Sequence, residues 1–243
     1  MKLALISGGS RGLGHAACEQ LIGDGFEVIE FSRTAPHDYS VRCDFADPTS
    51  VGQTITETLL SLDLSDLETL WVINNAGVLT PIGPTAKFET AELIDNMSVN
   101  IASAVVFMSE VMRQIQNLPA RKVIANISSG AATSPYAGWS LYCMAKAGIE
   151  QFVRSVAEEQ KNSVTPVTLL NFIPGVIDTE MQREIRLNSK ENFPEVQKFI
   201  NRHQQGLLRS SKQVAASLIL AMADQSLISG QTVSVDSYLT VDC

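Results

Sequence analysis

The chain has 243 residues, of which 45% are hydrophobic and 18% charged, a composition ordinary for a globular protein. Its formal net charge of -8 makes nucleic acid a poor partner, because phosphate backbones attract basic surfaces. No apolar run reaches the ~18 residues that a membrane span needs. The four cysteines form no C-x-x-C pair and do not cluster with the histidines, so we expect no metal, no disulfide framework, and reduced thiols suited to the cytoplasm. They are Cys18, Cys43, Cys143 and Cys243.

Short apolar segments alternate with helical ones along the chain. We expect strands at 2–7, 27–32, 41–43, 70–74, 122–127, 165–172 and 231–235. Helices are expected at 13–24, 47–61, 93–117, from 139–142 to 160, and at 213–223. Uninterrupted apolar strands between helices predict a parallel sheet with helices on both faces. With right-handed crossovers this is a Rossmann-type doubly wound α/β fold, a single domain over 1–243.

A glycine-rich segment, Ser7–Gly14, lies between the first strand and the first helix with the spacing G-x-x-x-G-x-G. Glycines there permit a tight turn and let backbone N–H groups approach a pyrophosphate at the helix N-terminus. The position between strand and helix favours a dinucleotide site over a merely flexible turn.

The end of the second strand indicates which dinucleotide binds. An NAD site usually places an acidic residue there to hold the ribose 2′-hydroxyl, whereas this strand ends in Ser32 and Arg33. Arg33 and Arg11 suit a 2′-phosphate, because guanidinium groups form charge-assisted bonds to it. The alternative is that both arginines are only solvated. Glu30 lies two residues too early, and we expect it to point into or beside the sheet. The pattern favours NADPH.

Tyr142 and Lys146 stand four residues apart in an expected helix, so they share one face. An ammonium near a phenol stabilises the phenolate and should lower the pKa of Tyr142 from its usual ~10. Such a tyrosine can give a proton to a carbonyl oxygen. Ser128 ends a strand at the edge where ligands bind, so its hydroxyl could reach the same oxygen. A tyrosine and lysine at this spacing also occur by chance on solvated helices.

The segment Asn74–Gly77 ends another strand, where Asn and Gly suit a turn. We expect this turn to pass beside the cofactor and to stabilise the ligand edge of the sheet. Asn100 falls inside a helix, where Asn is mildly unfavourable, and a structural hydrogen bond is the simplest reason for it.

Together these motifs resemble the short-chain dehydrogenase/reductase family over nearly the whole chain, through Pro174-Gly175, Thr179 and the closing Val235-Asp236. The resemblance implies that Tyr142 is the general acid and that Lys146 tunes its pKa and binds the nicotinamide ribose. It implies that Ser128 orients the substrate carbonyl and that Asn100 supports a water relay. The implied cofactor residues are Gly8, Ser10, Arg11, Gly12, Leu13, Gly14, Ser32, Arg33, Asp44, Phe45, Asn75, Ala76, Gly77, Tyr142, Lys146, Pro174, Gly175, Val176 and Thr179. Ser7 departs from the more common Thr but keeps the hydroxyl.

Two stretches, 127–142 and 174–182, resemble the benzil reductases and sepiapterin reductases within that family. We therefore expect an NADPH-dependent reductase of a ketone, foremost a vicinal dicarbonyl such as a benzil-like diketone. One alternative is a sepiapterin-type reductase in which Asp236 holds the pterin. Another is an NADP(H)-binding regulator without catalysis, which is disfavoured because the four catalytic positions are filled. The resemblance also implies a homodimer or homotetramer formed through the helices at 93–117 and 139–160.

The polar stretch 178–209 follows the ligand edge and is too long for an ordinary connection. Its apolar residues predict two short amphipathic helices, broken near Asn188 and Pro194. Such a segment can close over a substrate and exclude water, although a static surface excursion is the alternative. We expect Met181, Ile185 and Trp139 to form part of the substrate pocket.

Overall fold

The computed structural model describes residues 1–239. Its strands are β1 (Lys2–Ser7), β2 (Glu27–Ser32), β3 (Ser40–Arg42), β4 (Thr69–Asn74), β5 (Arg121–Ile127), β6 (Val167–Ile173) and β7 (Thr232–Ser234). The helices are α1 (Gly12–Gly23), α2 (Pro48–Leu60), α3 (Thr90–Met97), α4 (Ser103–Ile115), α5 (Ser140–Gln160), α6 (Glu180–Arg186), α7 (Val196–Gln204) and α8 (Ser211–Ala223). Short turns η1 (Thr85–Lys87), η2 (Ser98–Ala102), η3 (Gly130–Ala132) and η4 (Val235–Ser237) complete the described elements.

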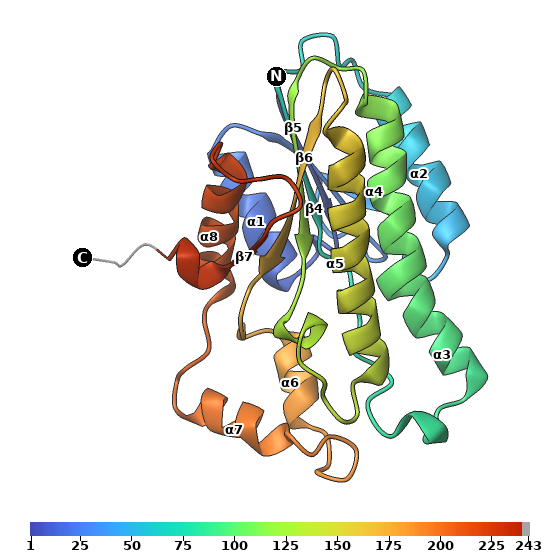
Figure 1. Cartoon of the computed structure of the whole chain (residues 1–243), viewed down its shortest axis with the longest axis vertical. Helices are drawn as coiled ribbons and strands as arrows, with labels where there is room; N and C mark the ends of the chain where they lie inside the picture. The colour runs from blue at the N-terminus through green and yellow to red at the C-terminus, as the bar shows by residue number, and fades with distance from the viewer. Residues whose placement is uncertain (240–243) are drawn as a thin grey trace.

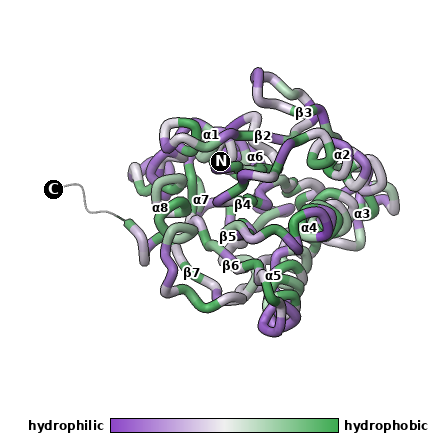
Figure 2. Tube along the Cα trace, turned by 90° about the horizontal axis from the view of Figure 1, so that it is seen from above, coloured by the Kyte–Doolittle hydropathy of each residue, from purple (hydrophilic) through white to green (hydrophobic). Residues whose placement is uncertain are grey.

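The strands form one parallel sheet in the order β3-β2-β1-β4-β5-β6-β7. Helices α1 and α8 cover one face, and α2, α4 and α5 cover the other (Figure 1). The view from above shows the same three layers (Figure 2). Helices α6 and α7 lie beyond the carboxyl ends of the strands, where they cover neither face. The expected doubly wound α/β fold is confirmed.

Element boundaries follow local chemistry. The Asp47 carboxylate accepts the N–H groups of Thr49 and Ser50, both at 3.1 Å, and caps α2 as expected. Strand β6 begins at Val167 and not at 165, because Pro166 has no N–H to give to the ladder. The helix expected at 93–117 begins earlier, at Thr90, and a π-helical turn, η2, separates α3 from α4.

Two apolar clusters fill the space on either side of the sheet. One packs β1, β4 and β5 against α2, α4 and α5, and the other packs the opposite face against α1 and α8. Lys122 enters the first layer with its side chain only 2% exposed. Its ammonium donates to the carbonyls of Leu118 at 2.7 Å and Thr165 at 2.9 Å, so the buried charge satisfies backbone acceptors past the ends of α4 and α5.

The continuous helical stretch Thr90–Ile115 is long and apolar enough to cross a membrane, by length and composition alone. Counting uninterrupted apolar runs missed it, because polar residues interrupt the stretch. In the structure α4 packs on α2 and α5 and gives Phe107, Met108 and Val111 to the core. That placement is the one a core helix of a globular domain takes.

The thiols within residues 1–239 are free, as expected. Burial raises the pKa of Cys18 to about 12 and that of Cys43 to about 11, so neither is a reactive thiolate near neutral pH. Cys143 is partly buried. Cys243 lies outside the described residues.

Candidate active site

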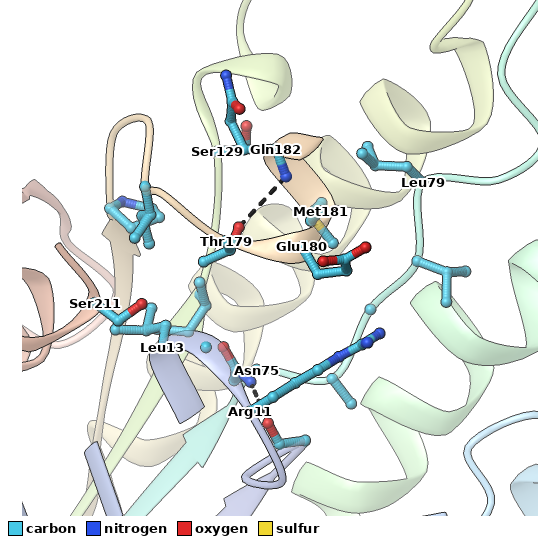
Figure 3. Close-up of a pocket in the computed structure, with 18 of the residues that line it drawn as sticks. Arg11, Leu13, Asn75, Leu79, Ser129, Thr179, Glu180, Met181, Gln182 and Ser211 are labelled. Atoms are coloured by element: carbon cyan, nitrogen blue, oxygen red, sulfur yellow. Dashed lines mark hydrogen bonds between the residues drawn. The ribbon is translucent and has the colours of Figure 1, made fainter. Parts of the chain in front are cut away.

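A cleft of about 1920 Å³ runs along the carboxyl edge of the sheet. In Figure 3, Arg11 and Leu13 of the glycine segment, Asn75 after β4, and Glu180 and Met181 of α6 line this cleft from separate parts of the chain. Small-molecule pockets usually measure about 300–1,000 Å³, so the cleft has room for a dinucleotide and a substrate together.

The expected cofactor residues gather in this cleft, with one exception. The cleft is lined by Gly8, Ser10, Arg11, Gly12, Leu13, Ser32, Arg33, Asp44, Phe45, Asn75, Ala76, Gly77, Tyr142, Lys146, Pro174, Gly175, Val176 and Thr179. Gly14 does not line it. A Cβ at Gly14 would lie 2.2 Å from the carbonyl oxygen of Gly8, so this glycine is needed for the close approach of α1 to the loop.

The glycine segment is held in place by the turn that follows β4, the strand beside β1. The Ser7 hydroxyl accepts the N–H groups of Asn75 at 2.9 Å and Ala76 at 3.0 Å. The Asn75 amide donates in return to the carbonyls of Ser7 at 3.1 Å and Gly8 at 2.9 Å. Gly8 has φ +70°, a conformation that favours glycine. The turn after β4 thus holds the glycine segment at the start of α1, as a pyrophosphate cradle requires.

A ladder of buried amides crosses the sheet directly beneath the cleft. Asn74, Asn126 and Asn171 are aligned in register on β4, β5 and β6. Asn74 donates to Asn126 at 3.0 Å, Asn126 donates to Asn171 at 2.8 Å, and the Asn171 amide donates to the backbone carbonyl of Glu150 on α5 at 3.3 Å. All three asparagines are buried. The ladder connects the strands that end at the cleft to α5. The sequence patterns did not predict this ladder.

The end of β2 has a polar arrangement of its own. Glu30 is fully buried, and its carboxylate accepts the Gly9 N–H at 3.1 Å and the hydroxyls of Ser32, at 3.0 Å, and Ser40. It therefore points inward, as expected, and braces the glycine segment. The Ser32 proton is committed to Glu30, so this hydroxyl cannot donate to a phosphate. Arg11 and Arg33 are exposed side chains at the cleft. The groups present fit a phosphate-rich dinucleotide.

Tyr142 lines the cleft and is buried on α5. Burial raises the pKa of Tyr142 to about 12, and the nearby Ser129 side chain opposes part of that rise. The net lowering of this pKa that the sequence predicted is wrong for this structure, because burial raises the pKa instead. The Lys146 ammonium donates to the carbonyl of Ile127 at 2.7 Å and lies 5.6 Å from the centre of the phenol ring. At neutral pH the phenol is protonated, the form that a general acid needs.

The serine beside the phenol is Ser129 and not the expected Ser128. Ser128 is 2% exposed, and its hydroxyl donates to the Glu150 carboxylate at 2.5 Å. Ser129 is less buried, and its hydroxyl accepts the Ala131 N–H at 3.1 Å. The backbone is extended at Ser129, so the two neighbouring side chains point to opposite sides. Both line the cleft, but the proton of Ser128 is already committed.

Asn100 lies in the π turn η2 and forms a clamp on the loop after β4. Its amide accepts the N–H of Val78 and donates to the carbonyl of the same residue, both at 2.9 Å. A third bond runs from Asn100 to Asn96 at 3.0 Å. The structural hydrogen bond expected for Asn100 is therefore present, and a π turn at this position is typical of functional sites. Its support of a water relay remains a prediction.

The stretch 178–209 forms two short helices, α6 and α7, as expected. Its base is closed, because the Asp178 N–H donates to the Arg209 carbonyl at 2.9 Å and the Arg209 N–H donates to that of Val176 at 3.1 Å. Met181, Ile185 and Trp139 all line the cleft. An apolar cluster joins the stretch to the start of α5 and comprises Leu79, Ala131, Trp139, Tyr142, Ile185, Phe193, Val196 and Phe199.

Asp236, proposed from the sequence as a substrate residue, lies outside the cleft lining. Its carboxylate forms an ion pair with Arg209 and accepts the Ser234 hydroxyl at 3.3 Å. The structure thus places Asp236 at the base of the 178–209 stretch, where it anchors Arg209.

Comparisons with known proteins agree with this geometry. The sequence profile of the short chain dehydrogenase family matches residues 2–190. A benzil reductase ((S)-benzoin forming) from Bacillus subtilis (strain 168) is 34% identical over 98% of this chain and 100% of its own, and a Bacillus cereus benzil reductase is 32% identical over 97% and 100%. A sepiapterin reductase from Xenopus tropicalis is 30% identical over 82% of each chain.

A solved short chain dehydrogenase/reductase structure from Saccharomyces cerevisiae has a TM-score of 0.82 at 19% identity, covering 99% of this chain and 100% of its own. That likeness supports the fold alone. On the family profile and the Bacillus relatives, the chain belongs to the short chain dehydrogenase family. It is an oxidoreductase that acts on CH–OH or C=O groups with a nicotinamide cofactor.

Proposed function

We propose that the chain is an NADPH-dependent carbonyl reductase whose preferred substrates are vicinal diketones of the benzil kind. The observation that carries the proposal is the meeting of Tyr142, Ser129 and Lys146 in the cleft that the glycine segment also lines. Benzil reductases aligned over nearly the full chain supply the substrate class.

The chemistry assigns one task to each of these side chains. A bound nicotinamide cofactor supplies the hydride to the carbonyl carbon. Tyr142, protonated at neutral pH, gives its proton to the carbonyl oxygen as negative charge develops there. Ser129 donates its hydroxyl proton as a hydrogen bond to the same oxygen and stabilises that charge. The Lys146 ammonium, held by the Ile127 carbonyl, provides a positive charge beside the phenolate that remains. Reprotonation of Tyr142 restores the site.

Two arginines at the cleft support NADPH over NADH. Arg11 and Arg33 are exposed, line the cleft, and approach it from the loops after β1 and β2, where the adenine ribose binds in this fold. No carboxylate ends β2, because Glu30 is buried and bonded to Gly9. A 2′-phosphate would find two cations there and no carboxylate at the end of β2.

The substrate end of the cleft favours an aryl ketone. Trp139 and Phe199 line it, with their rings 5.4 Å apart in an edge-to-face arrangement, and Tyr136 lies 5.2 Å from Trp139. Aromatic walls of this kind bind flat aromatic groups through burial and stacking. The pterin alternative loses its anchor, because Asp236 is engaged with Arg209 away from the cleft lining.

A substrate panel with NADPH tests the proposal. We expect NADPH oxidation with benzil at a kcat/KM well above that with sepiapterin. Faster turnover of sepiapterin would support the pterin alternative. Tight NADPH binding with oxidation by neither compound would indicate a regulator without catalysis. The same panel with NADH tests the cofactor preference, and equal rates with both dinucleotides would overturn it.

A further inference from the structure

Glu150 is a buried carboxylate that the proposed chemistry does not use. It lies on α5, four residues after Lys146 and eight after Tyr142, so the three side chains follow one face of the helix. The Glu150 side chain is 2% exposed. A carboxylate taken so far out of water must be compensated by hydrogen bonds or charge, so its partners reveal what it does.

Each oxygen of Glu150 has a defined partner. Oε1 accepts the Ser128 hydroxyl at 2.5 Å, and Oε2 accepts an Arg154 guanidinium N–H at 2.5 Å. Arg154, which is 44% exposed, also donates to the Thr232 hydroxyl on β7 at 3.2 Å. The Glu150 backbone carbonyl accepts the last amide of the asparagine ladder, Asn171. Glu150 thus connects α5 to the residue after β5 through its carboxylate, to β6 through its backbone carbonyl, and to β7 through Arg154.

We propose that Glu150 is a positioning residue for the reductase site, which takes up the hydroxyl proton of Ser128 and holds Lys146 in its ammonium form. The catalytic consequence of this inference rests on the proposed function. The hydrogen bond to Ser128 and the effect on the charge of Lys146 do not depend on it.

The first part follows from proton counting at two adjacent serines. A serine hydroxyl has one proton to donate. Ser128 gives its proton to Glu150, while the Ser129 hydroxyl lies on the other side of an extended backbone and accepts the Ala131 N–H, which leaves its own proton free. Glu150 therefore assigns the two serines different tasks and leaves Ser129 as the donor available to a carbonyl oxygen.

The second part follows from charge. Burial lowers the pKa of Lys146 to about 8, and the negative charge of Glu150 acts in the opposite direction. Without Glu150, burial would be unopposed and Lys146 would lose its proton at a lower pH. The group facing Lys146 from β5 is the neutral Ile127 carbonyl, and Tyr142 faces it from α5.

The elements packed against α5 bring little further charge to Lys146. Strand β6 and the turns η2 and η3 hold no titratable side chain. Helices α3 and α4 also contact α5, and β5 carries two basic residues at its far end. The charged side chains on these three elements are Glu92, Asp95, Glu110, Arg113, Arg121 and Lys122, whereas Glu150 is the charged group that raises the pKa of Lys146.

Two substitutions move the charge beside Lys146 in opposite directions. Glu150→Gln keeps the shape but removes the negative charge, and Arg154→Met leaves that negative charge without its guanidinium. We would label the chain with 13C,15N-lysine and follow the Cε and Nζ shifts of Lys146 against pH, with no cofactor or substrate present. Lys146→Arg assigns the signal. Glu159→Gln, an exposed acid on the same helix, is the matched control and should leave the titration unchanged.

We expect Glu150→Gln to lower the pKa of Lys146 by about one unit and Arg154→Met to raise it by less, because the guanidinium is partly exposed and screened. An unchanged Lys146 titration in Glu150→Gln would overturn the inference, as would a fall in Arg154→Met. If Glu150→Gln does not fold, Arg154→Met decides alone: a rise supports the inference, and no rise overturns it.

Turnover tests the serine part and follows only if benzil is reduced. In wild type the basic limb of the kcat profile should follow the Lys146 titration, and in Glu150→Gln it should move to lower pH with it. Ser128→Ala combined with Glu150→Leu should lower kcat no further than Glu150→Leu alone, because each change removes the same hydrogen bond, whereas a glutamine oxygen at 150 could still accept it. Additive losses would overturn the role assigned to Ser128. Absence of benzil reduction would count against the proposed function, whereas the Lys146 titration would still test the effect of Glu150 on the charge of Lys146.

Discussion

The indole ring of Trp139 lies nearly parallel to the ring of Phe193, with 4.3 Å between the ring centres and 14° between the planes. Trp139 immediately precedes α5, which carries Tyr142, and Phe193 lies between α6 and α7. Phe193 is fully buried and Trp139 nearly so. This stack fastens the 178–209 stretch to the catalytic helix, so movement of the stretch must break an aromatic contact at the substrate wall.

The first prediction concerns that stack. Phe193→Ala leaves a cavity beside Trp139, and truncating a buried aromatic ring costs about 3–5 kcal/mol. We expect faster hydrogen exchange across α6 and α7 and a several-fold higher KM for the diketone, with NADPH affinity nearly kept. Leu187→Ala, an exposed position in the same stretch, is the control.

Hydrogen exchange also tests whether the stretch is a lid. We propose that 178–209 closes over the substrate, so its exchange should slow when NADPH and benzil are both present. Equal and strong protection with and without them would mean that the stretch is static.

The second prediction concerns cofactor choice. Arg11→Ala and Arg33→Ala should each weaken NADPH more than NADH, because only NADPH carries the 2′-phosphate. The loss of one charge-assisted contact corresponds to about 1.5–3 kcal/mol, or roughly 10- to 150-fold in Kd. Fluorescence titration with both dinucleotides measures it, and Arg202→Ala on α7 serves as a control outside the cleft lining. An equal loss of affinity for NADH and for NADPH would show that the arginines do not bind the 2′-phosphate.

The third prediction separates the two serines. Ser129→Ala removes the hydroxyl proposed to stabilise charge on the carbonyl oxygen, and such a donor contributes about 10²–10³ in kcat. Ser128→Ala should cost less, because its hydroxyl acts through Glu150. Steady-state kinetics of both variants decide the assignment, and a larger loss in Ser128→Ala would reverse it.

The fold could be predicted from the sequence because its signals are local. Apolar strands, Asp47 at a helix start and Pro174-Gly175 after a strand each act over a few residues. The glycine segment and Tyr142 with Lys146 could also be placed, since strand order brings their elements to one edge. The two short helices at 178–209 followed from the spacing of their apolar residues.

The remaining features depend on how distant segments align. Ser128 and Ser129 are chemically identical in the sequence, and only the direction of the chain leaving β5 decides which one meets Tyr142. From the sequence alone Glu150 would be taken for a solvent-exposed helix residue, and only the folded structure brings the Ser128 hydroxyl into hydrogen-bond contact with it. Asp236 is drawn to Arg209, which is distant in sequence, and so leaves the substrate side.

The asparagine ladder gives the fourth prediction. Asn126→Ala leaves the side-chain N–H of Asn74 without its acceptor and the side-chain oxygen of Asn171 without its donor, and both groups are buried. Each unsatisfied group costs about 1–3 kcal/mol, so we expect a marked loss of stability in denaturant unfolding. Asn201→Ala, exposed on α7, should unfold like wild type. Wild-type stability in Asn126→Ala would mean that the ladder contributes nothing.

The fifth prediction concerns the proton donor. Tyr142→Phe keeps the ring that packs against Trp139, 5.7 Å away between ring centres, and removes only the transferable proton. The measurement is the rate of NADPH oxidation with benzil near pH 7, together with the NADPH dissociation constant, for wild type and variant. We expect wild type to oxidise NADPH and the variant to turn over at least ~10²-fold more slowly, as general acid catalysis requires, with NADPH affinity nearly unchanged. Wild-type turnover in Tyr142→Phe would contradict the assignment of the general acid.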